Sequence, residues 1–479
     1  MHPRNFYRDK IDFTQLADAY PPLKNYLIQA SNHPNKIIDF KDQAAQRCLT
    51  EALLHRDFNL KMSLPPDRLC PPVPNRLNYV LWLQDVISAS DYMKEQNAEV
   101  MVHGVDIGTG SSAIYPLLAC TLEKSWNFVV SEIDPSSFES ANRNILANEL
   151  NDRIRVIQPG ASSPILLPLF LDESKCFDFT MCNPPFYGSI QEVIQSAEAK
   201  QYGPNAVCTG AEVEMITSGG ESTFVAEMVK ESLVVRERCR WFTSMLGKLS
   251  SVAEIVEIFK SNSIDNYILA EFVQGQTRRW AVGWSFTDIR LPDSISRIPN
   301  ANPTISKCIP AHNTIKQPVL SASKESLCDA LTSILSSINH LFFKSIHNRT
   351  TYDMDVDTEP NASADFLVFA QEDTWSRSAR RRQNQLLDKS SGRNTFEQSS
   401  GSAQTASDLV HSSRMACSIH VLQPPANDSV VPPSNPALTE SKSATVTATE
   451  NFTMEFNWRQ GRDRDLFASF CSHISRKMR

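Results

Sequence analysis

Three apolar segments, each ending in a turn before a stretch of helical spacing, place the strongest limit on how this chain can fold. The first runs into a glycine turn at Gly108, the second ends at Glu132, and a later one ends at Asn183. Alternation of strands and helices favours α/β architecture with a doubly wound, Rossmann-like parallel sheet. In such a sheet, ligands bind beyond the carboxyl ends of the strands. We therefore expect Gly108, Glu132 and Asn183 to lie around one ligand site.

The chain has 479 residues, a length that suffices for two or three domains. Its composition and the spacing of its apolar residues change along the sequence. Residues 1–291 alternate apolar segments with polar turns, as expected of the folded α/β domain. Residues 292–318 are rich in Pro, Asn and Ser and are expected to form a linker. Residues 319–479 then regain helical and strand-like patterns, which indicates a second, smaller domain.

This second domain is expected to be split into two halves, about 319–382 and 415–479. Residues 383–450 are mostly Ser, Thr, Asn, Gln and Pro, apart from a short apolar island at Met415–Leu422. Apart from this island, such a composition buries too little apolar surface to offset chain entropy, so we expect the insertion to be disordered.

Composition and charge exclude several kinds of protein. The net charge of −7 excludes a uniformly basic nucleic-acid binder, so phosphate contacts must come from local basic patches. No run of 18 apolar residues exists, and we expect no membrane-spanning helix. The 11 cysteines include no CxxC pair, which argues against a zinc ribbon or a disulfide framework. We expect reduced thiols, an intracellular protein and no metal site.

The first candidate site is the glycine turn that follows Asp106. Gly108 and Gly110 would let the backbone approach a ligand closely, although an ordinary strand-to-helix turn is the alternative. The sequence continues GTGSSA, so the G-x-G-x-x-G dinucleotide pattern is absent, as is a GxxxxGK[ST] phosphate loop. Neither ATP nor a dinucleotide is therefore favoured.

Glu132, at the end of the second strand, is the second candidate. A carboxylate at this position can accept hydrogen bonds from both hydroxyls of a ribose. A solvated strand end is the alternative for an isolated glutamate. A glycine turn combined with this acid suits an adenosine-containing cofactor that lacks a pyrophosphate, and S-adenosylmethionine is the candidate.

The segment Asn183-Pro184-Pro185-Phe186 is the strongest signal and the candidate catalytic group. Two prolines end the strand and hold the turn in extended geometry. The Asn183 amide and the Pro184 carbonyl can then accept both hydrogens of an exocyclic amino group, while Phe186 lies against the base. A Pro-rich loop without function is the alternative.

These groups suit methyl transfer to adenine N6. Its nitrogen lone pair is delocalised into the ring, and two accepted hydrogen bonds would localise it and direct it at a sulfonium methyl. Alignment for in-line displacement would supply much of the acceleration, without a strong base. In a folded RNA, the target base would have to leave its stack.

The motifs VDIGTGSSAIYPLL, SEID and CNPPF occur in this order, preceded by FKDQAAQRCLTEALLHRDFNL and RLNYVLWLQD and followed by MLGKLSS and EFVQGQTRRWAVGWSF. In these motifs the chain resembles the eukaryotic U6 small nuclear RNA adenine-N6 methyltransferases, relatives of the bacterial 23S ribosomal RNA adenine-N6 methyltransferases. This resemblance covers about residues 1–287. The segments EDTWSRSARRR and NWRQGRDRDLF resemble the C-terminal region of vertebrate members.

The resemblance implies a Rossmann-like class I methyltransferase domain whose residues 1–75 form an RNA-contacting extension. It also implies a smaller, split α+β RNA-binding domain at the C-terminus. The residues that it assigns to S-adenosylmethionine are Arg76, Gly108, Glu132, Asn183 and a hydroxyl at Ser162 or Ser163. Asp106 and Gly110 belong to the same expected cofactor set.

RNA contacts are expected from basic residues outside the cofactor set. The resemblance implies Lys41 and a loop at 188–210, although this loop lacks the arginines of other members. Basic clusters with neighbouring aromatic groups favour single strands and loops, so a hairpin is the expected RNA. A solvated charged face is the alternative for each cluster. The remaining RNA candidates are Lys248, Arg278, Arg279, Arg380, Arg381 and Arg382.

We thus expect an RNA N6-adenosine methyltransferase that acts on U6 small nuclear RNA, as a monomer or weak oligomer. The expected location is the nucleus, with the cytoplasm as a second location. Ribosomal RNA is an alternative substrate. The NPPF motif could also serve amino groups of glutamine or cytosine in protein or DNA. A non-catalytic RNA-binding regulator is the alternative from a different class.

Overall fold

The computed structural model describes residues 1–29, 36–93, 100–198, 210–275, 277–347, 364–379, 381, 412–423 and 450–479. The chain divides into two compact units. Unit 1 comprises residues 1–287 and 294–310, and unit 2 comprises residues 288–293 and 311–479. Among the described helices, none is both long enough and apolar enough to cross a bilayer.

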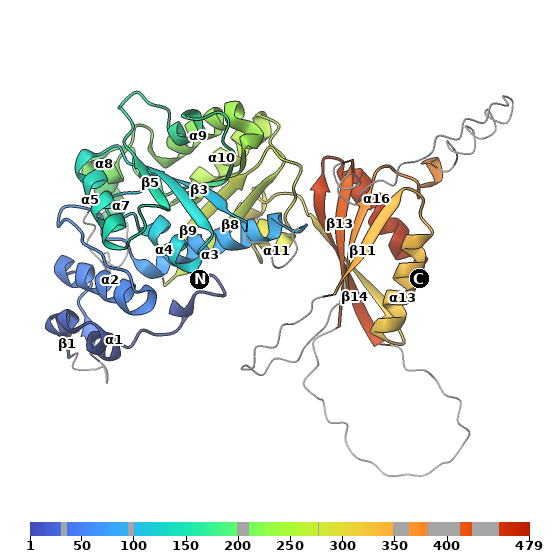
Figure 1. Ribbon diagram of the computed structural model, residues 1–479, viewed down its shortest axis with the longest axis horizontal. Helices are drawn as coiled ribbons and strands as arrows, with labels where there is room; N and C mark the ends of the chain where they lie inside the picture. The colour runs from blue at the N-terminus through green and yellow to red at the C-terminus, as the bar shows by residue number, and fades with distance from the viewer. Residues whose placement is uncertain are drawn as a thin grey trace, which may run out of the picture. The chain divides into compact units, whose positions relative to one another are not determined.

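Unit 1 is built on a seven-stranded sheet with the order β5-β4-β3-β6-β7-β9-β8 (Figure 1). Its strands are β3 (Val102–Ile107), β4 (Trp126–Ser131), β5 (Ile154–Ile157), β6 (Phe177–Cys182), β7 (Cys239–Leu246), β8 (Tyr267–Gln274) and β9 (Thr277–Trp284). Strands β5, β4, β3, β6 and β7 are parallel, and chain order reverses at β3. This arrangement confirms the predicted Rossmann-like α/β fold.

Helices cover both faces of this sheet, with α3 and α4 on one side and α9 and α10 on the other (Figure 1). The helices that follow the strands are α4 (Ile114–Leu122), α5 (Pro135–Ala147), α6 (Leu167–Phe170), α7 (Ile190–Glu198), α8 (Glu212–Met215), α9 (Gly220–Val235), η3 (Arg236–Arg238) and α10 (Leu249–Ser261). Val105 and Phe242 of the sheet, Val229 of α9 and Ile255 of α10 are completely buried in one core. This apolar core holds the strand ends in place.

The far edge of the sheet is antiparallel, a feature that the predicted parallel sheet lacks. Strand β9 pairs with both β7 and β8 in antiparallel register. Only two residues separate β8 from β9, which is too short for the crossover that a parallel pair requires. The short connection therefore forces β9 to run back beside β8.

The N-terminal part of unit 1 is mainly helical. It comprises η1 (Phe6–Arg8), α1 (Phe13–Ala19), η2 (Pro21–Tyr26), a two-stranded sheet of β1 (Leu27–Ile28) and β2 (Ile37–Ile38), α2 (Gln43–Phe58) and α3 (Val73–Ser90). Asp42 begins α2 by accepting a hydrogen bond from Ala44 N–H, and Asn59 ends it in the left-handed conformation. Helix α3 carries Arg76 near its start.

Residues 292–318, predicted to be a linker, are folded instead. Ile298 and Ile305 are buried in the core of unit 1. Helices α11 (Asp293–Ser296) and α12 (Pro303–Ser306) lie here, and strand β10 (Thr314–Ser321) of unit 2 begins within the same stretch. The prediction was wrong because Asn302 and Pro303 begin a helix, the former by capping it and the latter at its first position.

Unit 2 is a five-stranded antiparallel sheet with the order β10-β14-β13-β12-β11. Its remaining elements are α13 (Lys324–Ser336), β11 (Leu341–His347), β12 (Ala364–Ala370), β13 (Met415–Leu422), β14 (Glu450–Gly461) and α16 (Arg464–Lys477). Leu331 of α13 and Phe470 of α16 share one buried cluster with Val368 and Phe456 of the sheet. Both helices therefore pack against the same face, and the predicted α+β architecture is confirmed.

The apolar island predicted inside the insertion is β13, a central strand of this sheet. It pairs with β12 on one side and β14 on the other, and Ile419 is completely buried. Strand β13 therefore joins the two predicted halves of the domain. Most of the remaining predicted insertion, at 383–411 and 424–449, lies outside the described residues.

Candidate active site

A cavity of about 290 Å³ opens at the carboxyl ends of β3, β4 and β6. Gly108 follows β3, Glu132 follows β4 and Asn183 follows β6, and all three line the cavity. Arg76, Gly110 and Ser163 line it as well. The parallel strands thus bring together residues that lie far apart in the sequence.

The glycine turn leaves one wall of the cavity open. Gly108 and Gly110 have φ values of +68° and +69°, which L side chains rarely adopt. A Cβ atom at Gly108 would meet nothing within 4 Å, so the turn presents bare backbone to the cavity. The Ser111 hydroxyl next to it is buried without a hydrogen-bond partner among the described residues. Such an orphaned group is suited to a ligand.

Glu132 is held in place by two backbone N–H groups. Its Oε2 accepts a hydrogen bond from Gly110 N–H at 2.8 Å, and its Oε1 accepts one from Asp134 N–H at 2.9 Å. Burial raises the pKa of Glu132, although these hydrogen bonds oppose the shift. Each oxygen keeps a lone pair, so the carboxylate can accept further hydrogen bonds from a ribose.

The turn that starts at Asn183 ends β6 at the mouth of the cavity. The Asn183 Oδ1 is buried and accepts no hydrogen bond from any described residue. The Phe186 ring lies against Gly247, where an added Cβ would come within 2.9 Å of the ring. The Arg279 guanidinium lies 5.0 Å from the centroid of that ring. The turn therefore combines a free acceptor with a supported aromatic ring.

Arg76 projects from α3 into the same cavity. Its guanidinium donates to the Tyr115 hydroxyl at 2.9 Å and lies 5.4 Å from the Tyr115 ring centroid. Its Nε is buried without a partner, and no ion pair of Arg76 occurs among the described residues. An unpaired guanidinium of this kind suits a carboxylate.

Two predicted cofactor contacts, the hydroxyl at Ser162 or Ser163 and the side chain of Asp106, differ in whether they line the cavity. Ser163 lines the cavity, and its Oγ accepts a hydrogen bond from Gly160 N–H at 3.1 Å. Ser162 does not line it, which favours Ser163 of the two hydroxyls. Asp106 also lies outside the lining, because its side chain is completely buried at the end of β3.

Family comparisons agree with this geometry. Residues 1–288 match a family described as RNA methyltransferase. The chain belongs to this RNA methyltransferase family. The RNA N(6)-adenosine-methyltransferase METTL16 of Mus musculus is 38% identical over 301 residues, covering 62% of this chain and 53% of the mouse protein. The Danio rerio protein of the same name is 33% identical over 398 residues, which cover 80% of this chain and 79% of its own length.

Another relative is the U6 small nuclear RNA (adenine-(43)-N(6))-methyltransferase of Schizosaccharomyces pombe. It is 37% identical over 310 residues, which cover 65% of this chain and 76% of the yeast protein. The chain spans about half the length of its curated mouse, human, chicken and frog relatives.

Solved structures of the same family share the fold. The human Mettl16 catalytic domain in complex with MAT2A 3′UTR hairpin 1 has a TM-score of 0.56 and 36% identity, and the match covers 63% of this chain and 99% of that one. The N-terminal domain of human METTL16 in complex with SAH has a TM-score of 0.50 and 36% identity, over 60% of this chain and 99% of that one.

The basic residues predicted for RNA contact differ in how they are paired. Lys248 forms an ion pair with Glu192, and Arg278 forms one with Glu271 at 3.1 Å. Arg279 donates a hydrogen bond only to the Arg278 carbonyl among the described residues, and burial lowers its pKa. Arg279, which lies against the Phe186 ring, is therefore the least neutralised of these three cations.

The other candidates for RNA contact are exposed, form ion pairs, or lie outside the described residues. Lys41 and Arg381 are exposed, whereas Arg380 and Arg382 lie outside the described residues. Residues 199–209 of the predicted RNA-contacting loop also lie outside the described residues. Within the predicted RNA-contacting extension of residues 1–75, Arg4 forms an ion pair with Asp85 at 2.6 Å.

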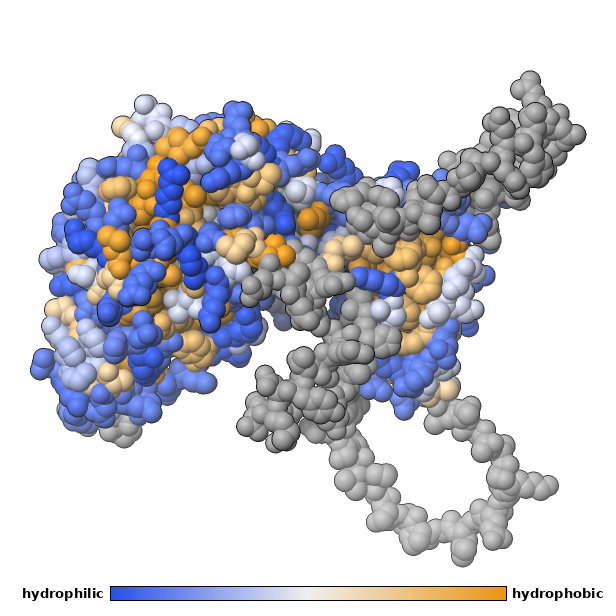
Figure 2. Space-filling view, viewed as in Figure 1, coloured by the Kyte–Doolittle hydropathy of each residue, from blue (hydrophilic) through white to orange (hydrophobic). Residues whose placement is uncertain are grey.

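Sequence reasoning missed several residues that line the cavity. The omitted lining residues include Leu69, Pro71, Tyr115, Ile133, Val213, Glu214 and Phe224. Ile133 and Val213 are 48% and 44% exposed, and apolar side chains reach the surface between hydrophilic ones around α5, α7 and α8 (Figure 2). The position of Ile133, directly after Glu132, could have signalled its place. No motif marks Glu214.

The buried Asp106 yields a pH-dependence prediction. Burial raises its pKa to about 7, and the nearby charge of Glu132 adds to this effect. The folded protein therefore holds a proton that the unfolded chain releases near pH 4, so stability from this group is complete below that pH and is lost as pH rises towards 7. Asp106→Asn, neutral at every pH, should remove this loss, which is about 2–4 kcal/mol.

Urea unfolding of the cofactor-free protein at pH 5, 6, 7 and 8 measures this effect. The free energy of unfolding of the wild type should fall relative to Asp106→Asn as pH rises. A difference between the two proteins that stays constant over this range would contradict the assignment.

Proposed function

We propose that this protein transfers a methyl group from S-adenosylmethionine to the N6 amine of an adenosine in a structured RNA, and that this RNA is U6 small nuclear RNA. The observation that carries the proposal is the Asn183 Oδ1, which is buried, has no partner among the described residues, and lies at the cavity that Gly108 and Glu132 also line. The names of the mouse and yeast relatives support the reaction and the substrate.

The cavity fits S-adenosylmethionine by the chemistry of its lining. Glu132 would accept hydrogen bonds from the ribose, and Arg76 would bind the carboxylate of the amino-acid end. The bare backbone at Gly108 and the orphaned Ser111 hydroxyl offer further contacts. When bound, the cofactor supplies an activated sulfonium methyl.

The turn at residues 183–186 is the proposed catalytic turn, and it would act by holding the target amine. Asn183 Oδ1 and the Pro184 carbonyl accept its two hydrogens, which localises the nitrogen lone pair and fixes its direction. Phe186 supports the base by stacking, with Arg279 behind the ring. No side chain must remove a proton first, because the amine becomes acidic only as its new bond forms and can then release the proton to water. Alignment of the amine nitrogen with the methyl group and the sulfur supplies much of the rate acceleration.

Unit 2 and the exposed basic residues would bind the rest of the RNA. The solved human relative is bound to an RNA hairpin, which supports a hairpin as the substrate shape. The adenosine would leave its stack to reach Asn183. Nuclear location follows from the U6 substrate and belongs to the same proposal.

A substrate panel tests the proposed function. The full chain is incubated with methyl-labelled S-adenosylmethionine and U6 small nuclear RNA, a ribosomal RNA hairpin, or a U6 variant with the target adenosine changed to guanosine. We expect label in U6 RNA alone, recovered as N6-methyladenosine. Stronger labelling of the ribosomal hairpin would replace the substrate, and absence of label from every RNA would overturn the proposed reaction.

Neighbouring arginines on β9 provide a matched pair for RNA binding. Arg279→Ala should weaken RNA affinity about tenfold, because the Arg279 guanidinium supports the Phe186 ring and forms no ion pair with any residue that the structure describes. Arg278→Ala should have much less effect, since Arg278 is already paired with Glu271. Filter binding of a hairpin at several salt concentrations measures both. Equal losses for the two variants would contradict the distinction.

A further inference from the structure

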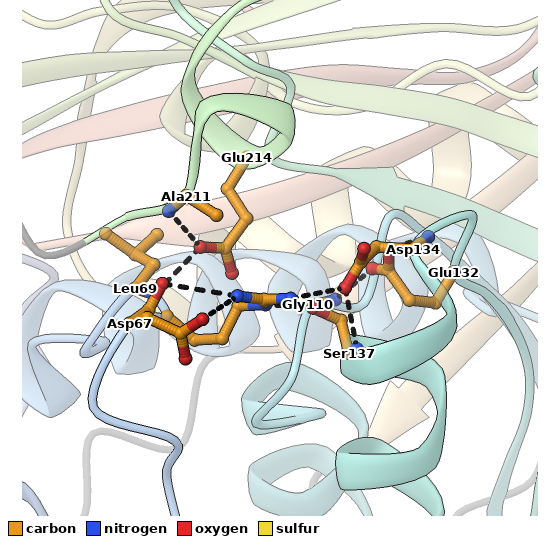
Figure 3. A network of polar contacts seen from close by, with 9 residues as sticks. Asp67, Leu69, Gly110, Glu132, Asp134, Ser137, Ala211 and Glu214 are labelled. Atoms are coloured by element: carbon orange, nitrogen blue, oxygen red, sulfur yellow. Dashed lines mark hydrogen bonds and ion pairs between the residues drawn. The ribbon is translucent and has the colours of Figure 1, made fainter.

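The cavity has a wall that no cofactor motif predicts, formed by helix α8. Val213 and Glu214 of this short helix line the cavity together with Leu69 of the segment that precedes α3. Figure 3 shows the Glu214 side chain descending from α8 towards the same network that contains Gly110 and Glu132. Glu214 therefore brings a second carboxylate to the glycine turn.

The two oxygens of Glu214 have different surroundings. Oε2 accepts hydrogen bonds from Leu69 N–H at 2.9 Å and from Ala211 N–H at 2.8 Å. Oε1 accepts no hydrogen bond from any described residue, and it lies 4.0 Å from the position of a Cβ built on Gly110. The backbone bonds thus fix the carboxylate, while the second oxygen lies over Gly110.

Glu214 and Glu132 both lie at Gly110, in the same part of the cavity. Glu132 accepts the Gly110 N–H, and Glu214 Oε1 lies near the Cα side of the same residue. Burial raises the pKa of Glu214, and its charge also raises the pKa of Glu132. Two carboxylates whose charges oppose each other gain from a ligand that gives each of them a hydrogen.

We propose that Glu214 is a second ribose-binding carboxylate, which shares the hydroxyl pair of the bound cofactor with Glu132. This inference rests on the proposed use of S-adenosylmethionine. A ribose offers two O–H donors, and both oxygens of Glu132 already receive backbone N–H groups. Within the described part of the chain nothing donates to Glu214 Oε1, so this oxygen accepts one hydroxyl while Glu132 accepts the other.

This assignment also connects cofactor binding to the catalytic turn. Tyr187, which directly follows Phe186, donates its N–H to Met215 O at 3.0 Å and accepts one from Thr217 N–H at 2.9 Å. These two hydrogen bonds pair Tyr187 with residues 215–217, a segment that begins one residue after Glu214. A ribose held by Glu214 therefore steadies the segment that pairs with the catalytic turn.

The test compares Glu214→Gln with Glu212→Gln in the full chain. The amide that replaces the Glu214 carboxylate can still accept the Leu69 and Ala211 N–H groups but lacks the charge at the free oxygen. Glu212 is exposed on the same turn and serves as the matched control. Calorimetric titrations use S-adenosylhomocysteine and 5′-methylthioadenosine, which keeps the ribose and adenine but lacks the amino-acid end.

We expect Glu214→Gln to weaken both ligands by the same factor, about tenfold, and Glu212→Gln to change neither. A loss confined to S-adenosylhomocysteine would overturn the ribose assignment, because it would point to the ammonium group. Unchanged binding of both ligands by a variant that melts like the wild type would overturn it too. Absence of binding by the wild type would instead refute the proposed cofactor.

A double variant separates direct contact from a structural effect. If Glu132 and Glu214 share one diol, the loss in Glu132→Gln/Glu214→Gln should differ from the product of the single losses. A combined loss equal to that product would contradict a shared ligand group. Glu214→Ala, which also releases Leu69 and Ala211, should bind more weakly than Glu214→Gln.

Discussion

Asn183→Ala is expected to lower the rate constant of methyl transfer about 10²- to 10³-fold, comparable with the loss of one preorganised transition-state hydrogen-bond group. The buried Asn183 Oδ1 has no partner among the described residues, so its free capacity is reserved for the amine. Loss of this acceptor leaves the nitrogen lone pair delocalised and its direction unfixed. Single-turnover transfer to a saturating RNA hairpin measures the step itself.

The control for this variant is Asn142→Ala. Asn142 lies on α5 and donates to Phe138 O within its own helix, away from the cavity lining. It should leave the rate constant unchanged, and RNA affinity should persist in both variants. Full-rate transfer by a folded Asn183→Ala protein would contradict the role given to the catalytic turn.

Trp458→Ala is expected to destabilise unit 2 by about 3–5 kcal/mol, the usual cost of truncating a buried large aromatic residue. Trp458 is 1% exposed and stacks on Phe467 at 5.8 Å between ring centroids. The Arg290 and Arg464 guanidinium groups lie 4.7 and 4.9 Å from its ring centroid. Truncation therefore removes contacts among three segments of unit 2.

Differential scanning calorimetry of the full chain measures this loss as an earlier transition for unit 2. Trp458→Phe is the matched control, because it keeps an aromatic ring against Phe467. Unit 1 has its own core, so transfer to a short hairpin should persist at temperatures at which unit 2 has unfolded and unit 1 has not. An unchanged calorimetric profile for Trp458→Ala would contradict the packing described for unit 2.

Sequence patterns predicted the parts of the fold whose determinants are local. The apolar run of β3 and the glycine turn after it predict a strand end, and the two prolines after Asn183 stop β6. The antiparallel position of β9 depends on a short connection that an alternation rule does not weigh. The fold of residues 292–318 depends on burial of Ile298 and Ile305, which composition does not reveal.

The candidate site also combines residues that local patterns predict with residues that only long-range contacts bring in. Gly108, Glu132 and Asn183 each follow a strand, so the edge of a parallel sheet brings them together by rule. Glu214 reaches the cavity by hydrogen bonding to Leu69, a residue 145 positions earlier in the sequence. No local pattern encodes that contact, and only the folded chain reveals it.

The most direct measurement is a crystal structure of the full chain with S-adenosylhomocysteine and a U6 RNA hairpin. The account predicts an unstacked adenine whose N6 lies about 2.7–3.2 Å from Asn183 Oδ1, with the ribose of the ligand at Glu132. A target base that stays stacked in the RNA, or an adenine amine bound away from Asn183, would contradict it.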